Sequence, residues 1–338
     1  MQIKSPINIQ EEIKAIKGNS SARKFTLVLG SGFHKQAIGN SLCLSNWDQL
    51  LIQLGSKTCL NKNYILQFEE LILDRAKKEN DAPAHMREAK LLADVKDILK
   101  NESLELDFCA YDNLKFLFNT DLVSDIISLN YDSVAEKICT KELNHQTKVE
   151  WENKNSCAEN LSSKSKARIK WMTDYRSIGN TGEKSIRFWY PHGNIRRKNS
   201  IVLGIHKYSQ LLISFDSIRN HYKKNEKAYF GLHKKPQKID WDSIDLSWYS
   251  QLLNNPVIFL GASLSDSEWD LWTAITHAKR NFAKEKNTEY SHNMYIMLAK
   301  EQKCHPNSTW LKPLFAGMSF DEQWGKLKYY FEKKIKNS

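Results

Sequence analysis

The feature that most constrains this chain is a nearly unbroken apolar run, Phe25 to Leu29, that ends at Gly30-Ser31-Gly32. A short apolar run bounded by glycine is typical of a strand buried on both faces of a parallel sheet. Stretches of helical spacing separate it from comparable runs over residues 125–129, 185–189, 256–260 and 294–298. Since strands that alternate with helices favour a parallel sheet with helices on both faces, the sequence predicts an α/β fold.

The chain divides into three predicted parts. Residues 1–24 form a polar lead-in, residues 25–300 the main domain, and residues 301–338 a helical closure. Within the main domain, apolar residues recur at helical spacing over about 47–123 and again over 205–253, where many are aromatic. This periodicity predicts two helical insertions, so the sheet is expected to carry a helical insertion or subdomain.

Four shorter segments complete the prediction of secondary structure. Helices are expected over residues 9–16 and 321–336, the second with an apolar stripe along one face. The polar region 141–184 has few apolar residues and is expected to be a loop insertion or a small lid. Residues 200–203 are expected to form a strand that follows the pair His192-Gly193.

The charge of the chain favours anionic partners but does not identify one. The 338 residues include 50 Lys and Arg against 39 Asp and Glu, which gives a net charge of +11. Nucleotides, nucleic acid and acidic protein surfaces would all suit such a charge. The lysines are scattered rather than grouped in one block, so a solvated basic surface is the simplest interpretation. Contact with nucleic acid has no binding motif to support it.

The cysteines and the N-terminus indicate where the protein resides. None of the six cysteines forms a CxxC pair, which argues against a four-cysteine zinc site and against a disulfide framework. The first 17 residues contain no long apolar segment, and the apolar stretch at 257–262 is too short to span a bilayer. We therefore expect a reduced, cytoplasmic protein without a metal and without a membrane span.

The turn Gly30-Ser31-Gly32 is a candidate phosphate site. Glycines after a strand let backbone amides approach a pyrophosphate, and a helix that follows would add its positive N-terminal end. The six-residue dinucleotide fingerprint would place a third glycine at position 35, where this chain has Lys35. A plain strand-to-loop turn therefore explains the two glycines as well as a phosphate does.

Polar residues follow the apolar run at 125–129. Asn130 can exchange hydrogen bonds with ribose hydroxyls or an attacking water, at the edge of the sheet where ligands bind in such folds. Asp132 is a second candidate for contact with a nucleotide. The structural alternative is a turn-forming Asn130 and an Asp132 that caps a helix beginning near Val134.

His192 and the segment Gly261-Ala262-Ser263 complete the candidate site. The imidazole of His192 suits proton abstraction near neutral pH, and Gly193 permits a tight bend beside it. The alternative is that His192 is a hairpin residue before a Gly-Asn turn. The glycine and hydroxyl of Gly261 and Ser263 can hold a second ribose, or they simply form a turn. Ser265 and Glu268 then form a capping box that predicts the start of a helix.

These segments, in this order, resemble the SIR2-like family, and within it the bacterial anti-phage branch rather than the deacetylating sirtuins. The resemblance covers residues 25 to 270 and rests on Gly30-Ser31-Gly32 with Trp47, Asn130-Tyr131-Asp132, His192-Gly193 and Gly261-Ala262-Ser263. It implies a Rossmann-like fold that binds NAD and a helical insertion that forms the other wall of the site. The sequence departs from the family pattern at one position, where Phe33 replaces the small or hydroxyl residue usual after the glycine turn.

The resemblance also implies residue roles. Asn130 and His192 match the catalytic pair of the family. The residues implied to contact the nucleotide are Gly30, Ser31, Gly32, Phe33, Asp132, Gly261 and Ser263. Of these, the glycine turn would lie against the pyrophosphate and Ser263 near the adenosine ribose.

The function implied is that of an NAD+ hydrolase. NAD+ would be the substrate, nicotinamide and ADP-ribose the products, and no metal would take part. Such an enzyme would serve in abortive infection, restrained by a partner protein encoded nearby or by homo-oligomerisation. Two alternatives stay open, an NAD-dependent protein deacylase and a catalytically silent subunit that binds NAD or ADP-ribose. The missing zinc cysteines argue against the deacylase.

Overall fold

A computed structural model describes the parts of the chain that carry the sheet, most of its helices and most of the candidate site. The described residues are 9–18, 23–56, 63–78, 83–142, 151–152, 175–179, 185–197, 200–213, 247–262, 264, 268–284, 293–297, 311–315 and 317–333. The predicted contact residue Ser263 and the capping residue Ser265 lie outside these ranges.

One sheet organises the described residues, and its strands run in the order β3-β4-β5-β2-β1-β6-β7-β8. Six of them pair in parallel: β5 (Ser185–Trp189), β2 (Val123–Ser128), β1 (Phe25–Leu29), β6 (Val257–Leu260), β7 (Met294–Ile296) and β8 (Lys312–Pro313). The chain moves from β1 to β2 and β5 on one side, then returns to place β6 on the other side of β1. This is the Rossmann order, and it confirms the predicted α/β fold.

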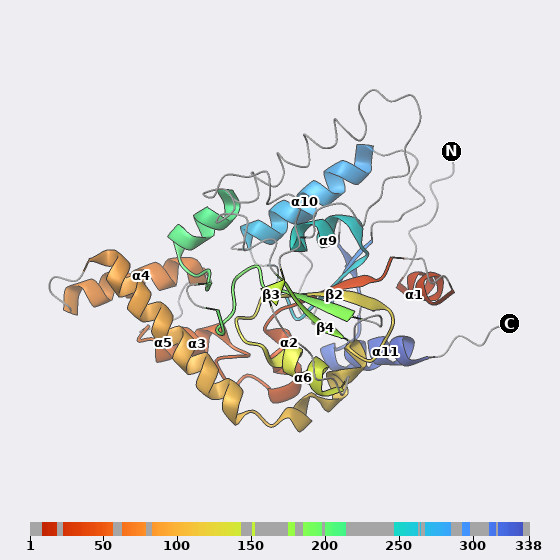
Figure 1. Ribbon diagram of the computed structural model, residues 1–338, viewed down its shortest axis with the longest axis horizontal. Coiled ribbons are helices and arrows are strands. Elements are labelled where there is room, and N and C mark those ends of the chain that lie inside the picture. Colours follow the sequence, from red (N-terminus) through yellow and green to blue (C-terminus); the bar gives the residue numbers. More distant parts are fainter. Residues whose placement is uncertain are drawn as a thin grey trace.

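Helices cover both faces of the sheet (Figure 1). On one face lie α9 (Trp248–Asn254) and α10 (Trp269–Lys284). The opposite face carries α2 (Gly32–Ile38), the 3-10 helix η1 (Phe108–Leu117), α6 (Val134–Glu142) and α11 (Phe320–Glu332). The predicted first insertion forms α3 (Trp47–Gln53), α4 (Tyr64–Lys78) and α5 (Ala84–Glu105), which extend to one side of the sheet. Helix α1 (Ile9–Gly18) precedes β1.

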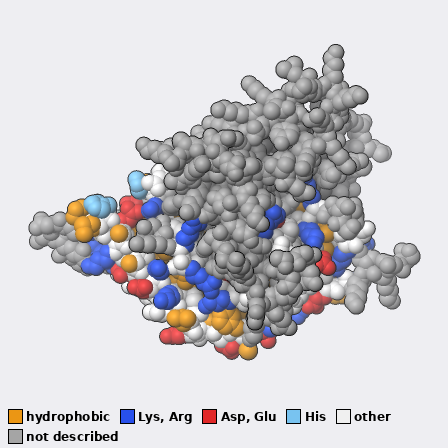
Figure 2. Space-filling view, viewed as in Figure 1, with side chains coloured by type: hydrophobic (Ala, Val, Ile, Leu, Met, Phe, Trp, Pro, Cys, Tyr) orange, Lys and Arg blue, Asp and Glu red, His pale blue; other side chains and the backbone are white. Residues whose placement is uncertain are grey.

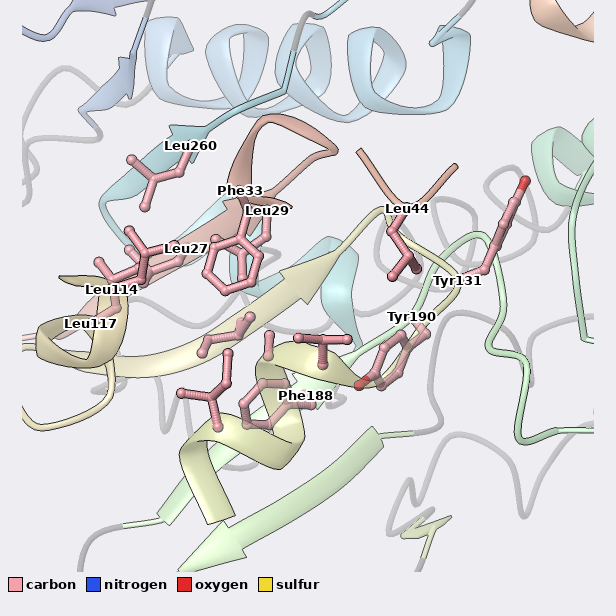
Figure 3. Close-up of a cluster of buried hydrophobic side chains, with 14 of the residues drawn as sticks. Leu27, Leu29, Phe33, Leu44, Leu114, Leu117, Tyr131, Phe188, Tyr190 and Leu260 are labelled. Atoms are coloured by element: carbon pink, nitrogen blue, oxygen red, sulfur yellow. The ribbon is translucent and has the colours of Figure 1, made fainter. Parts of the chain in front are cut away.

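Strand β1 shows why the sheet needs both helical layers. All five of its side chains are buried, and alternate residues point to opposite faces. Leu27 and Leu29 pack in the cluster on the α2 and η1 side, shown in Figure 3, whereas Val28 packs in the cluster under α9 and α10. A strand of this kind is stable only between two apolar layers, which the continuous apolar run predicted.

Two predictions of secondary structure were wrong. Residues 201–203 form no strand, although their side chains are buried; the N–H of Val202 donates to the carbonyl of His192 at 2.7 Å. The region 141–184 contains strands β3 (Trp151–Glu152) and β4 (Tyr175–Gly179), which extend the sheet antiparallel beside β5. Antiparallel strands at the end of a sheet need no second apolar face, so the polar sequence of this region did not indicate them.

The surface and the helices bear on the predicted partners only in part. On the face in Figure 2, Lys and Arg side chains lie scattered among acidic and apolar ones on the described surface. Within the described ranges, no helix is long and apolar enough to cross a membrane. Helix α1 is fixed by Lys17, whose ammonium donates to the carbonyls of Tyr330 and Phe331 at 3.0 Å, near the end of α11.

Candidate functional site

The turn after β1 packs backbone to backbone against the turn after β6. The N–H of Gly30 donates to the carbonyl of Leu260 at 3.0 Å, and that of Gly32 donates to the carbonyl of Gly261 at 2.9 Å. A Cβ built on Gly30 would lie 2.4 Å from the carbonyl oxygen of Gly261, and one on Gly32 would lie 2.5 Å from its Cα. Gly261 itself has φ +66°, a conformation that favours glycine. The three glycines therefore allow the turns after β1 and β6 to pack in direct backbone contact. This is the point where the strand order of the sheet reverses.

This packing limits the number of backbone amides in the turn after β1 that can donate to a phosphate. The N–H of Phe33 donates to the carbonyl of Gly30, so three amides of this turn bond within the protein. The side chain of Phe33 is fully buried and packs against Tyr111, so only its backbone belongs to the turn. Ser31 is different, because it is half-buried and its hydroxyl makes no capping bond to α2.

Asn130 follows β2 and leans toward the same turn. Its Nδ2 donates to the carbonyl of Gly30 at 3.1 Å, and the residue is 9% exposed. Within the described ranges, no hydrogen bond is made by its Oδ1. The carboxamide is thus held in place by one end, while its acceptor end remains for a hydroxyl or a water.

Asp132 lies two residues further on and is bonded through both carboxylate oxygens. One oxygen accepts from Val134 N–H at 2.8 Å, which caps α6 as the sequence alternative proposed. The other lies 2.9 Å from Nε2 of His34, whose Nδ1 lies 2.8 Å from the Tyr111 hydroxyl. Burial raises the pKa of Asp132, but His34 and the backbone bonds more than offset this and hold it below its ordinary value. Asp132 therefore joins α2 to the β2 loop as a charged carboxylate.

His192 enters the site on the loop after β5. Gly193 has φ +90°, and its N–H donates to the carbonyl of Tyr190 at 3.0 Å. The N–H of Val202 donates to the carbonyl of His192, so the chain folds back on itself here, but residues 200–203 form no strand and β5 pairs with β4. His192 therefore lies in a folded-back loop and not in a strand of a β-hairpin.

Buried polar groups tie this loop to the β2 loop. The N–H of Ile195 donates to the carbonyl of Tyr131 at 2.8 Å. Asn194 is fully buried, and its Nδ2 donates to the carbonyl of Asp132 at 3.1 Å and to Ser133 at 3.0 Å. All of these bonds join the loop after β5 to the loop after β2. They therefore fix the position of the His192 loop relative to the end of β2.

The His192 ring is almost enclosed by charged and aromatic groups. Its Nε2 lies 2.8 Å from a carboxylate oxygen of Asp270 and 3.3 Å from the Tyr208 hydroxyl. Burial lowers the pKa of His192, but Asp270, Glu268 and the backbone of Leu129 raise it, and the net shift is upward.

The structure therefore brings together Gly30, Ser31, Gly32, Asn130 and Gly261 at neighbouring strand ends. His192 lies on the loop after β5, which is hydrogen-bonded to the loop after β2. The sequence interpretation missed four partners of these residues: His34, Asn194, Tyr208 and Asp270. Only Asn194 carried a local signal, as the residue after the His-Gly pair. His34 and Asp270 bond across 98 and 78 residues of the chain, which no spacing reveals, whereas Tyr208 lies 16 residues after His192 within the second predicted insertion.

The amino-acid sequence over most of the sheet matches a known family. Residues 124–313, more than half of the chain, match the SIR2-like domain family. The chain belongs to the SIR2-like family. SIR2-like domains are in general NAD-dependent enzymes that use NAD+. The match spans Asn130, His192 and Asp270, while β1 and its glycine turn precede it. No curated protein was found that matches the chain.

The donor groups of this SIR2-like domain give no indication of a metal. Among the described residues, no group of three or more His, Cys, Asp or Glu side chains is arranged to hold a metal ion. Of the six cysteines, Cys43 and Cys139 are buried and Cys109 is exposed, and these three are not in disulfides.

Proposed function

We propose that this SIR2-like chain is an NAD+ glycohydrolase that cleaves the bond between nicotinamide and ribose. The observation that carries the proposal is that Asn130, bonded to the glycine turn of β1, lies on the loop after β2, to which the His192 loop is hydrogen-bonded through Ile195 and Asn194. Ligands bind at this end of an open α/β sheet, where the strand order reverses. NAD+ is the substrate, and the products are nicotinamide and ADP-ribose.

In the proposed reaction the protein does not have to activate the leaving group. Nicotinamide is cationic in NAD+ and departs as a neutral base, which leaves an oxocarbenium-like ribose. The protein then has to orient the ribose and a water, and take up the proton that the water loses. Asn130 suits the first task, because its Oδ1 can accept from a ribose hydroxyl or a water while Nδ2 is held by Gly30. Ser31 is the hydroxyl of the turn best suited to the pyrophosphate.

His192 suits the second task in its neutral form. With the Nε2–H donated to Asp270, the neutral ring carries its lone pair on Nδ1. The carboxylate of Asp270, 2.8 Å from Nε2, favours the protonated ring, in line with the raised pKa of His192. Loss of the proton from Nδ1 would leave that nitrogen able to bind a water.

The test is to follow nicotinamide and ADP-ribose released from NAD+ by the purified chain. His192→Ala should lower the rate by about 10²–10⁴-fold, the usual worth of general acid–base catalysis. His277→Ala is the matched control, since its ring lies 2.6 Å from the Tyr249 hydroxyl on the α9 and α10 side, as His192 lies beside Tyr208. A His192→Ala variant that releases nicotinamide at the parent rate would sink the proposal.

Two further arms separate the alternatives. Release of nicotinamide only in the presence of an acylated peptide would make the chain a deacylase. Binding of NAD+ without release would make it a silent subunit. Running NADP+ beside NAD+ gives the nucleotide preference.

We also propose that the hydrolase acts in abortive infection against phage and is restrained until a trigger arrives. A constantly active NAD+ hydrolase would deplete its own cell, so a partner encoded nearby or a homo-oligomer is expected to hold it in check. The test is to follow cellular NAD+ with the chain expressed alone and together with its genomic neighbour, using His192→Ala as control. Equal NAD+ levels in all of these cells, with and without phage, would contradict the proposal.

A further inference from the structure

Three buried aspartates flank the sheet, and one of them differs from the other two. Asp125 accepts from the Arg187 guanidinium at 2.7 and 2.8 Å and from the Trp189 indole at 2.9 Å. Asp132 is likewise bonded through both oxygens, to His34 and to Val134 N–H. These carboxylates have the full set of partners expected of buried structural charges.

Asp270 has no such set. The residue is fully buried, one oxygen lies 2.8 Å from Nε2 of His192, and the other has no hydrogen-bond partner in the described part of the chain. An unsatisfied buried carboxylate oxygen is costly, so stability alone does not account for the residue. Its one strong contact is with the proposed base.

The fold delivers Asp270 to this position from the far side of the switch point. Helix α10 begins at Trp269, and the carbonyl of Glu268 accepts from Trp272 N–H at 3.0 Å, so Asp270 lies in the first turn. The next residue, Leu271, is fully buried in the cluster on the α9 and α10 side and fixes that turn against the sheet. The Asp270–His192 contact thus joins the β6–α10 connection to the loop after β5.

We propose that Asp270 is a positioning residue of the active site, which holds the Nε2–H of His192 so that Nδ1 is the nitrogen presented to the reacting water. The proposal rests on the hydrolase function proposed above and adds the residue that orients its base. Asp270 does not touch the water itself. Its effect on turnover passes through the imidazole, in the same way that a carboxylate orients the histidine of a hydrolase triad.

The charged and titratable groups around the ring predict the direction of a pH effect. Asp270 and Glu268 come from the α10 side, and Tyr208 comes from the helical segment 205–213. Burial, with the nearby Asp270 charge, raises the pKa of Tyr208 well above its ordinary value, so that hydroxyl stays protonated. Glu268 adds to the upward shift of the His192 pKa but comes after Asp270. Removing the Asp270 charge should therefore lower the pKa of His192.

The experiment compares Asp270→Asn, Asp270→Glu and the parent over a pH series. A base works only when deprotonated, so kcat/KM rises with pH through the pKa of His192 in the free enzyme. In Asp270→Asn this rise should move to lower pH, and the plateau of kcat should fall by about 10²-fold with little change in KM. Asp270→Glu keeps the charge and should restore the position of the rise. Asp125→Asn, which removes an equally buried charge, should leave the profile where it is.

Two measurements keep the inference separate from the hydrolase function. The first is the NMR titration of the His192 ring, assigned with His192→Gln, which needs no turnover. A pKa of His192 in the parent at or below the ordinary value for histidine would overturn the inference, and so would an unchanged pKa in Asp270→Asn. The second is the double variant with His192→Ala, in which Asp270→Asn should cost nothing further. An additional loss would mean that Asp270 acts on its own. If Asp270→Asn does not fold, the titration of the parent and the Asp270→Glu profile decide.

Discussion

Gly193→Ala should reveal how tightly the active-site loop is held. Gly193 has φ +90°, and a Cβ on it would lie 1.9 Å from the carbonyl oxygen of Ser200. A Cβ atom essentially never comes within 3.0 Å of a non-bonded heavy atom. The segments around Gly193 and Ser200 therefore have to move apart by about 1 Å. The neighbouring residue is His192, the proposed base.

The magnitude follows from the strain and from the bonds across the gap. The left-handed conformation costs an alanine about 1–2 kcal/mol. Parting the loop stretches the 2.7 Å bond from Val202 to His192 and the 2.9 Å bond from Asn194 to Ser200, each worth about 0.5–1.5 kcal/mol. We expect a loss of about 3 kcal/mol in the free energy of unfolding. A misplacement of about 1 Å near a reacting group also costs about 10²-fold in rate.

The assay is urea unfolding together with nicotinamide release, measured beside a matched glycine. Gly317 has φ +84°, and a Cβ there would meet nothing within 4 Å. Gly317→Ala therefore carries the conformational strain without the clash, and should lose about 1 kcal/mol and no activity. If Gly193→Ala is as stable and as active as Gly317→Ala, the loop is not held as described, and the reasoning about His192 placement fails.

Two further variants test the buried charges. Asp125→Asn should cost about 3 kcal/mol in urea unfolding, the low end for breaking a buried pair because Arg187 stays 26% exposed; a cost below about 1 kcal/mol would contradict the pair. For Asp132, the pKa is lower in the folded state than its usual 3.8, so its stabilisation is complete above that pH and is lost as the pH falls through the folded value. Asp132→Asn should therefore differ most from the parent at neutral pH and converge with it in acid, and a gap independent of pH would refute the His34–Asp132 pair.

The strands that the sequence predicted are those whose signal is local. Continuous apolar runs over β1, β2, β5, β6 and β7 predicted strands buried on both faces, and the structure pairs all five in parallel. The run at 201–203 looks alike because its residues are buried too, but its backbone bonds to His192 instead of a neighbouring strand. Burial alone therefore does not distinguish a strand from a packed loop.

The site was predictable where a residue stands at the end of a strand, and not where a partner comes from elsewhere. Asn130 and His192 follow β2 and β5 closely, so the position of their strands indicated them. Asp270 lies 78 residues from His192, and His34 lies 98 residues from Asp132. Both pairs come into contact only because the sheet brings their elements together, and a single sequence does not reveal contacts between such distant residues.

The glycines are weaker indicators of a nucleotide than the polar groups beside them. Gly30 and Gly32 are required by the approach of Gly261, so packing explains them whether or not a phosphate binds. Packing does not explain the hydroxyl of Ser31, the Oδ1 of Asn130 or the second oxygen of Asp270, which lack hydrogen-bond partners within the described ranges. Buried or half-buried polar atoms rarely stay unpaired unless something else binds them. The first two atoms belong to neighbouring connections at one end of the sheet, and a polar substrate that contacts both accounts for them. The oxygen of Asp270 is fully buried and belongs to the residue that we propose to position His192.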